Sequence, residues 1–416
     1  MLVSFSAKNY KSFYDEVTLD MRIEVNDSNR EEIENNPFVY KINDDYISKL
    51  CILYGHNGSG KSNLLNAIMY LFTINIYEDI EDYYKELFIP NMIYGKDEDT
   101  KFTLEFYNYD NEIYEYIITL DNKNKKIKYE LLKINNGIIF ERNNNLIING
   151  IDTFKDKDGI PNNESVISYF NSVDSYKEYI KYYKLGFAYN FLYNLIRKEY
   201  IDRYSFLPMD NIYSNLTEYK IWELYKKLIS LADVGIDDIK VVKNNIHNKY
   251  DNQLEKYLNE LNEYKFISFH KNYEDDFIKI ESEGTKTYAN NLYDILDSIK
   301  DGKLNILDEF NGVQSELLEL VINLFKKNMF EDLDNPTAQL ILSTHDTNLM
   351  CLKNTLLNHY WFLNKEDNKS ELYCASDFED LKREDLEKEY KRNSLKAKYN
   401  SRLFEIPSKF FINDEE

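Results

Sequence analysis

Residues 55–62 carry the pattern of a phosphate-binding loop, and this segment constrains the fold more than any other part of the chain. The pattern G-x-x-x-x-G-K-[ST] follows the apolar run 50–54 and directly precedes the segment 63–69. Such a loop needs a strand to deliver it and a helix whose N-terminus faces the anion. A glycine-rich turn that matched the pattern by chance would not need a strand before it and a helix after it. The sequence therefore predicts a strand, a phosphate-binding loop and a helix in succession.

Two side chains of this loop have specific chemistry. Lys61 is expected to reach the β- and γ-phosphates of ATP as a point charge, and Ser62 is expected to place its hydroxyl on Mg²⁺. The glycines allow backbone N–H groups to curl around the phosphate oxygens. The predicted nucleotide-binding residues of this segment are Gly55, His56, Asn57, Gly58, Ser59, Gly60, Lys61, Ser62 and Asn63.

A short apolar run that ends in two carboxylates, residues 304–309, is expected to supply the acids of the site. This pattern is typical of a buried parallel strand that delivers acids at its carboxyl end. We expect Asp308 to hold Mg²⁺, directly or through water, and Glu309 to orient and deprotonate the attacking water. Asp308 follows Lys61 by 247 residues (308 minus 61). A large insertion is therefore predicted between the two halves of the site.

Two further motifs flank the acidic strand. Ser282 and Gly284 lie at the start of a long amphipathic segment, where a helix N-terminus would meet an anion. His345 follows the apolar run 340–344, at the end of another predicted strand. The motifs thus occur in the order phosphate loop, insertion, Ser-x-Gly helix, Asp-Glu strand and Thr-His strand.

In this order the motifs resemble the ATPase heads of the ABC type, in the branch shared by SMC, RecF and OLD proteins. Within that branch, the likeness is to AAA-family ATPases of prokaryotic abortive-infection and restriction-linked defence operons, of the RloA and AbiEii type. It implies an α/β fold: a P-loop ABC-type head with a mixed sheet, an antiparallel β-subdomain and an inserted helical lobe. The likeness rests on residues 1–5, 9–13, 55–62, 231–236, 281–286, 307–309, 343–348 and 361–363.

The resemblance implies roles for the later motifs. Ser282 and Gly284 correspond to a signature that contacts the γ-phosphate held by a partner subunit, and His345 resembles the switch histidine that senses the same phosphate. Together with Lys61 and Glu309, His345 is expected to be catalytic.

The chain departs from the family at residues 313–314, where Val-Gln stands in place of Leu-His. No Gln occurs between Ser62 and Gln253, so the glutamine of the family's metal-coupling loop has no assigned position. Residues 357–360 and 398–402 also depart from the family pattern, so the family's partner contacts in the tail are not carried over to this chain.

Hydrophobic spacing predicts how the chain is divided. Residues 1–21 alternate as a β-hairpin, 22–48 are polar and predict a loop, and 100–141 predict an antiparallel β-meander. Helical spacing begins near residue 164, with stripes of Tyr and Leu that favour ordinary helix packing. A charged helix is expected from residue 377 to about 398. We therefore predict the first part of the head at 1–163, the helical lobe at 164–264 and the second part of the head at 265–416.

Composition limits the partners and the compartment. A formal net charge of -22 disfavours a surface that coats nucleic acid, although a local basic groove stays possible. No apolar run approaches the length of a membrane span, and the N-terminus does not look like a signal peptide, so a cytoplasmic protein is expected. Cys51, Cys351 and Cys374 show no paired spacing and are expected to be buried. His247 and His270 have no metal-ligand companions at useful spacing.

Two kinds of function remain from the sequence. The favoured one is a switch ATPase that dimerises head to tail around two Mg-ATP and controls a separately encoded toxin or nuclease during phage infection. The alternative is a scaffold that ATP stabilises with negligible turnover. A third interpretation keeps the ATPase but makes it a RecF-like DNA-repair protein, which salt-sensitive duplex binding would reveal.

Overall fold

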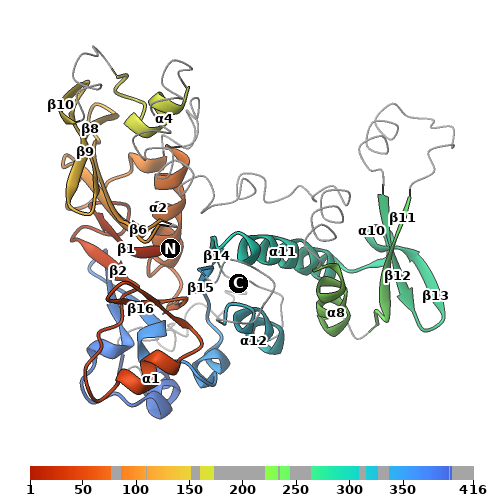
Figure 1. Ribbon diagram of the computed structural model, residues 1–416. Coiled ribbons are helices and arrows are strands. Elements are labelled where there is room, and N and C mark those ends of the chain that lie inside the picture. Colours follow the sequence, from red (N-terminus) through yellow and green to blue (C-terminus); the bar gives the residue numbers. More distant parts are fainter. Residues whose placement is uncertain are drawn as a thin grey trace, which may run out of the picture.

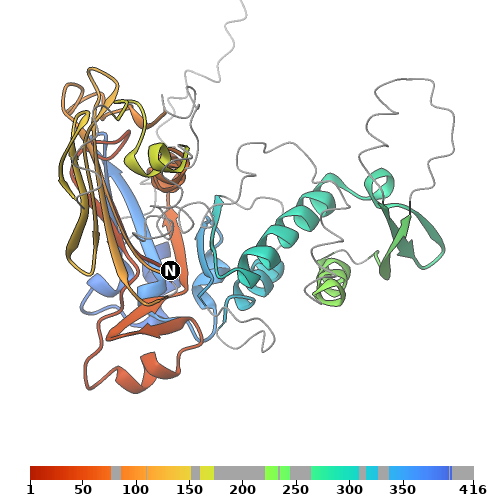
Figure 2. The same ribbon diagram turned by 45° about the horizontal axis from the view of Figure 1, so that its top comes forward.

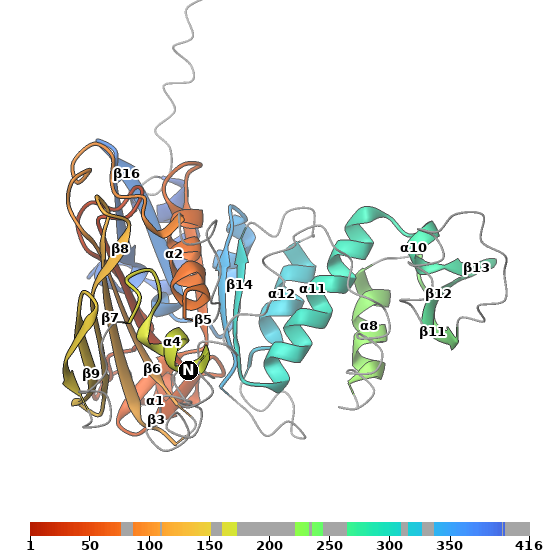
Figure 3. The same ribbon diagram turned by 90° about the horizontal axis from the view of Figure 1, so that it is seen from above.

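The computed structural model describes residues 1–75, 86–108, 110–150, 160–172, 221–232, 235–243, 264–308, 315–326, 337–392 and 394–395. In this part of the chain a seven-stranded antiparallel sheet and a five-stranded, mostly parallel sheet enclose helix α2 (Lys61–Thr73). Helices α11 (Glu283–Lys300), α12 (Ser315–Asn323) and α13 (Leu386–Lys391) supply buried side chains to the core on the opposite face of the five-stranded sheet. Figure 3 shows these layers in order, with the antiparallel sheet at the left and α11 (Glu283–Lys300) towards the right.

The five-stranded sheet carries the motifs. Its first four strands run parallel, and the fifth is antiparallel to its neighbour. The apolar run before the phosphate loop is buried on both faces, as expected of a central parallel strand. Cys51 and Leu53 face α2, whereas Ile52 and Tyr54 face the helices on the other side. The strand order is β14 (Leu304–Asp308), β15 (Gln339–Ser343), β5 (Leu50–Gly55), β16 (Tyr360–Glu366) and β17 (Lys369–Cys374).

The antiparallel sheet confirms the predicted hairpin and β-meander. Buried and less buried residues alternate along β7 (Ile113–Asp121), the period expected of a strand with one face in the core. The first strand of the chain pairs with both the second strand and the meander, so the hairpin extends the same sheet. The order is β10 (Leu146–Gly150), β9 (Gly137–Asn143), β8 (Lys126–Ile134), β7 (Ile113–Asp121), β6 (Thr100–Tyr107), β1 (Leu2–Lys8) and β2 (Val17–Asp20).

A small three-stranded sheet lies at the end of α11 that is remote from β14 (Figure 1). It consists of β11 (Asp238–Lys243), β12 (Tyr264–His270) and β13 (Tyr273–Asp276), followed by the short helix α10 (Phe277–Ile280). Helix α8 (Trp222–Ala232) lies beside α11, where the hydroxyl of Tyr225 donates to the carbonyl of Ala289 at 3.3 Å. No helix in the described ranges is long and apolar enough to cross a membrane.

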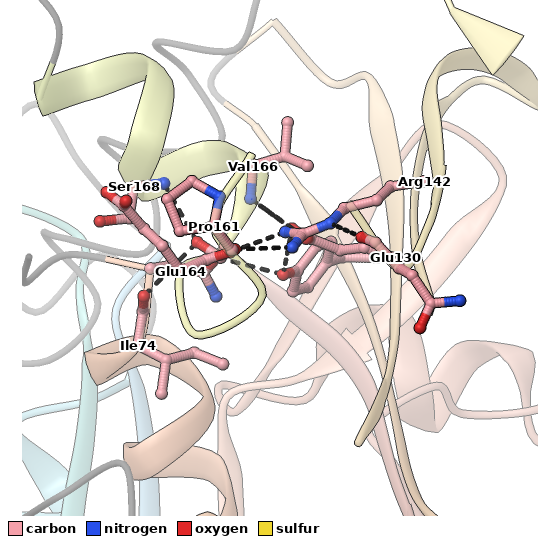
Figure 4. A network of polar contacts seen from close by, with 11 residues as sticks. Ile74, Glu130, Arg142, Pro161, Glu164, Val166 and Ser168 are labelled. Atoms are coloured by element: carbon pink, nitrogen blue, oxygen red, sulfur yellow. Dashed lines mark hydrogen bonds and ion pairs between the residues drawn. The ribbon is translucent and has the colours of Figure 1, made fainter. Parts of the chain in front are cut away.

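A buried ion pair connects β8, β9 and the segment 161–166 (Figure 4). Glu130 of β8 and Arg142 of β9 are fully buried, with Nη1 of the arginine 3.2 Å from Oε2 of the glutamate. Burial raises the pKa of Glu130, and the adjacent Arg142 opposes that shift. Three further N–H groups of the guanidinium donate to the carbonyls of Asn144, Pro161 and Glu164.

The same network reaches the helix that begins at the phosphate loop. The carboxylate of Glu130 accepts from Val166 N at 3.0 Å, at the start of α4 (Val166–Ser172). The hydroxyl of Tyr116 lies 2.8 Å from Glu130 Oε1 and 3.1 Å from Oδ1 of Asn75, just beyond the C-terminal end of α2, and its one proton can be donated to either oxygen. The segment that enters the insertion is therefore fixed against both α2 and the antiparallel sheet.

The structure corrects several sequence expectations. The predicted loop over 22–48 is wrong, because it contains α1 (Arg30–Asn35) and the hairpin of β3 (Val39–Ile42) and β4 (Asp45–Ser48). A few apolar side chains in this polar segment are enough for a small core: Ile33, Val39 and Tyr46 are buried together. The insertion is not helical throughout, since β11 lies within it. The predicted helical stripes of Tyr and Leu around residues 179–187 and 254–261 lie outside the described residues. The domain boundaries stay a prediction.

The predicted charged helix after residue 377 is also mostly wrong. Only α13 (Leu386–Lys391) is α-helical among the described residues there, and it follows short 3-10 turns at Ala375–Asp377 and Arg383–Asp385. Arg383 explains the break, because its guanidinium turns inward to donate to backbone carbonyls of Met350 and Leu352. Cys51 and Cys374 are buried as expected, but Cys351 is exposed.

Candidate nucleotide-binding site

The phosphate loop has the predicted local structure. Strand β5 ends at Gly55, and helix α2 begins at Lys61 with Gly60 as its N-cap. Gly60 has a φ of 113°, in the left-handed region that favours glycine. A Cβ at this position would lie only 2.8 Å from the hydroxyl oxygens of Ser12 and Ser370. The loop therefore needs glycine at residue 60 for both conformation and space.

Two serines outside the predicted site support this loop. The hydroxyl of Ser370, on β17, donates to the carbonyl of Ser59 at 2.6 Å. Ser12 accepts from the side-chain amide of Asn63 at 2.9 Å, and its carbonyl accepts from Ser370 N at 2.8 Å. Ser12 lies in a segment that the family resemblance singled out, whereas no sequence signal marked Ser370. The loop is thus held between the antiparallel sheet and the edge of the five-stranded sheet.

Lys61 and His345 are brought together by the sheet order. The Nζ of Lys61 is nearly buried and donates to the carbonyl of Gly55 at 2.9 Å. It also lies 3.2 Å from Nε2 of His345, at the end of the neighbouring strand β15. Because an ammonium group can only donate, Nε2 of His345 accepts this hydrogen bond. The lysine that is expected to meet the phosphates therefore contacts the predicted switch histidine directly.

Asp308 lies at the same carboxyl edge of the sheet, two strands from the phosphate loop. It pairs in register with Ser343 of β15, and the hydroxyl of that serine donates to Asp308 Oδ1 at 2.6 Å. Ser343 is fully buried and was not predicted as a site residue, although it begins one of the segments on which the resemblance rests. Its bond fixes the rotamer of the predicted metal ligand.

Tyr54 braces the turn that carries His345. Its hydroxyl donates to the carbonyl of Asp346 at 2.9 Å, and Thr344 N donates to the carbonyl of Leu53 at 3.0 Å. Burial raises the pKa of Tyr54, so the hydroxyl stays protonated and able to donate. On the far side of the turn, Asp346 caps the 3-10 helix Thr347–Cys351 by accepting from Asn348 N at 2.9 Å. The backbone around the histidine is fixed on both sides.

The residues present fit a magnesium ion. Ser62 is exposed at the first turn of α2, and Asp308 supplies a carboxylate at the end of β14, two strands away at the same edge of the sheet. Hydroxyl and carboxylate oxygens are the hard ligands that Mg²⁺ prefers, together with water and nucleotide phosphates. Glu309 and the departure at residues 313–314 lie outside the described residues.

The Ser-x-Gly motif lies elsewhere on the head. Ser282 is the N-cap of α11 and accepts from Thr285 N at 3.1 Å, as the sequence predicts. Ser282 and Gly284 are both exposed. Helix α11 has 18 residues, so it is roughly 27 Å long. Its C-terminal end leads into β14, and its N-terminal end lies beside α10, away from α2 (Figures 1 and 2). The structure therefore does not bring Ser282 and Gly284 to Lys61 of the same chain.

Solved structures of low sequence identity resemble this chain. The Smc head domain with a coiled coil and joint from Pyrococcus yayanosii matches with 11% identity and a TM-score of 0.46, over 94% of this chain and 99% of that chain. The SMC head domain from Thermotoga maritima matches with 12% identity and a TM-score of 0.42, over 90% and 98%. The recombination mediator protein RecF in complex with ATPrS matches with 11% identity and a TM-score of 0.38, over 89% and 98%. No curated protein sequence matches.

The sequence itself matches one family model, over residues 50–350. The match begins with β5, includes the phosphate loop, α11 and β14, and ends just after His345. It therefore covers most of the chain, including the phosphate loop and the Ser-x-Gly, Asp-Glu and Thr-His motifs, but not the segments 1–5, 9–13 and 361–363. Together with the phosphate loop and the sheet order, it identifies the fold as a P-loop AAA domain. The chain belongs to the family described as "AAA domain, putative AbiEii toxin, Type IV TA system".

Proposed function

We propose that this protein is a cytoplasmic ATP-binding and ATP-hydrolysing switch that closes head to tail with a second copy around two Mg-ATP. The observation that carries the proposal is the separation of two half-sites on one chain. Lys61, His345 and Asp308 lie together at one edge of the parallel sheet, whereas Ser282 is exposed at the far end of α11. A nucleotide on Lys61 can meet a Ser-x-Gly motif only if another copy supplies it.

Each residue at the sheet edge has a distinct task in the proposed reaction. Lys61 and the backbone N–H groups of the loop bind the phosphates, and Ser62 and Asp308 hold the metal. When bound, Mg²⁺ would neutralise negative charge on the nucleotide phosphates. Glu309 orients the attacking water and accepts its proton. His345 would take up a proton from solvent at Nε2, leave Lys61 and donate to the γ-phosphate, so its hydrogen bond would report whether that phosphate is present.

Such a site is complete only in the closed dimer, so ATP binding favours closure and hydrolysis favours opening. Family membership supports a role in anti-phage defence, in which the two states control a separately encoded toxin or nuclease. The partner would recognise one state of the dimer in preference to the other.

The deciding experiment is the native mass of the Glu309→Gln protein with and without Mg-ATP. Removing the proposed base while keeping the binding groups is expected to trap the closed state, so the mass should double with nucleotide. Glu309→Gln combined with Lys61→Ala is the matched control and should stay monomeric. An assembly that ignores ATP, with turnover unchanged by Glu309→Gln, would contradict the switch and favour a scaffold stabilised by nucleotide.

A further inference from the structure

The residue before Ser282 is held by a histidine of the three-stranded sheet. His270 Nε2 lies 3.0 Å from Glu281 Oε1. Both side chains are nearly buried, with exposed fractions of 11% for His270 and 5% for Glu281. Since an ionised carboxylate only accepts hydrogen bonds, the imidazole donates through Nε2–H. The sequence shows no metal-ligand companions for His270, but in the structure its side chain contacts Glu281, directly before Ser282.

His270 is supported by its own sheet. Its ring stacks on that of Tyr273 with centroids 4.4 Å apart and an interplanar angle of 9°, and the two residues pair across β12 and β13. On the buried face of β12, the ring of Phe266 contacts the rings of Trp222 in α8 and Phe277 in α10. The imidazole of His270 therefore belongs to a sheet that packs against α8 and α10.

Glu281 lies between α10 and α11 and connects the hydrogen bond from His270 to the start of α11. Its N–H donates to the carbonyl of Phe277 at 3.1 Å, which closes the last turn of α10. The next residue, Ser282, starts α11 by accepting from Thr285 N and, through its carbonyl, from Lys286 N. A nearly buried carboxylate is costly without a partner. The bond from His270 therefore fixes the direction in which the chain enters α11.

We propose that His270 is a positioning residue for the signature motif, acting through Glu281 to present Ser282 and Gly284 to the nucleotide of a second copy. This inference rests on the proposed function. His270 does not act on the nucleotide held by its own chain, because β12 and α2 lie at opposite ends of α11 (Figure 1). Loss of its hydrogen bond should therefore weaken closure and leave ATP binding by the single head intact.

The test compares His270→Ala with His270→Gln, whose side-chain amide can donate to Glu281 from nearly the same place. Dimerisation driven by Mg-ATP is measured by native mass in the Glu309→Gln background, and turnover is measured with Glu309 intact. ATP affinity is measured at protein concentrations too low for dimers. His270→Ala should weaken dimerisation and turnover about tenfold while ATP affinity stays within about twofold, and His270→Gln should recover most of the loss. Lys271→Ala, at the exposed neighbouring position, is the matched control and should behave as the parent does.

The outcomes separate this inference from the function on which it rests. Dimerisation and turnover that are normal in His270→Ala would overturn the positioning role while leaving the switch intact. The role would also be overturned if His270→Gln were as impaired as His270→Ala, or if His270→Ala lost ATP affinity in parallel. A Glu309→Gln parent that stays monomeric with Mg-ATP would instead contradict the proposed function, and the role of His270 with it.

Discussion

Lys61 Nζ and His345 Nε2 lie 3.2 Å apart although 284 residues separate them in the chain. Strands β5 and β15 bring them together, because they are parallel neighbours whose carboxyl ends meet at one edge of the sheet. We expect His345→Ala to lower ATP turnover about 10²-fold, the usual effect of removing one donor from a developing negative charge. ATP affinity, measured by calorimetry, should change little. Unchanged turnover would exclude His345 from the reaction.

Lys61→Ala should abolish ATP binding, because the ammonium is the charged group that the loop offers to the β- and γ-phosphates. Equilibrium binding of a fluorescent ATP analogue measures the loss directly. Lys123→Ala, in the exposed turn between β7 and β8, removes the same charge elsewhere and should bind as the wild type does. Retained affinity in Lys61→Ala would contradict the assignment of the phosphate loop.

Tyr54→Phe removes one hydroxyl and keeps the aromatic contacts with Tyr360 and Phe362. The carbonyl of Asp346 then loses its donor, and the turn that carries His345 becomes less ordered. Turnover should fall about tenfold while ATP affinity is kept. Tyr107→Phe, which loses the hydroxyl bond from β6 to Asp45 of β4, is the matched control. Equal turnover in the two variants would show that Tyr54 does not position the histidine.

Ser343→Ala should raise the Mg²⁺ concentration needed for half-maximal turnover about tenfold, because Asp308 loses the bond that fixes its rotamer. A magnesium titration at saturating ATP measures the shift. Ser6→Ala, whose hydroxyl bonds only across β1 and β2, should leave the titration unchanged. An identical curve for Ser343→Ala would mean that Asp308 needs no such support.

His359 should make the protein sensitive to acid. Burial, and then the adjacent Arg383, lower the pKa of His359 from 6.5 to about 3. The unfolded chain binds a proton below about pH 6.5, whereas the folded chain does so only near pH 3, so the free energy of unfolding falls as pH decreases through this window. Each unit of difference corresponds to about 1.4 kcal/mol. Denaturant titrations from pH 7 to 4 should show a shallower fall in His359→Asn, which can still accept from Leu356 N.

Arg142→Met should lower the free energy of unfolding by about 3–5 kcal/mol, because it leaves the carboxylate of Glu130 buried without its cation. The double variant Glu130→Leu with Arg142→Met should recover part of that loss, since no charge then remains in the core. Chemical denaturation measures both values. A double variant as unstable as Arg142→Met would show that the backbone carbonyls around Arg142, rather than Glu130, account for the cost.

The parts of the site that depend on local sequence could be predicted. The phosphate loop, the acidic strand and the helix after Ser282 each combine a short motif with the period of one element. Contacts between remote segments carried no such signal. Nothing near Ser370 in the sequence indicates that its hydroxyl holds the carbonyl of Ser59, because only the pairing of β16 and β17 brings it there.

Two predictions of secondary structure from the sequence were wrong because tertiary contacts decide these segments. Residues 22–48 are mostly polar, so their helix and hairpin depend on a few side chains that meet residues elsewhere, such as Leu356. The helix expected after residue 377 does not form over its whole length, and Arg383 within it instead donates to the backbone carbonyls of Met350 and Leu352. In both places a tertiary contact overrides the local pattern.

The order of strands in the five-stranded sheet has a consequence for synthesis on the ribosome. The antiparallel sheet uses only residues 2–150, so its pairings can form as that segment emerges. Strand β5 is made early, but both of its neighbours, β15 and β16, lie after residue 338. Such long-range pairing is slow and leaves an apolar strand exposed until its partners arrive. We therefore expect a nascent chain that ends before β15 to be unable to hold nucleotide and to depend on chaperones.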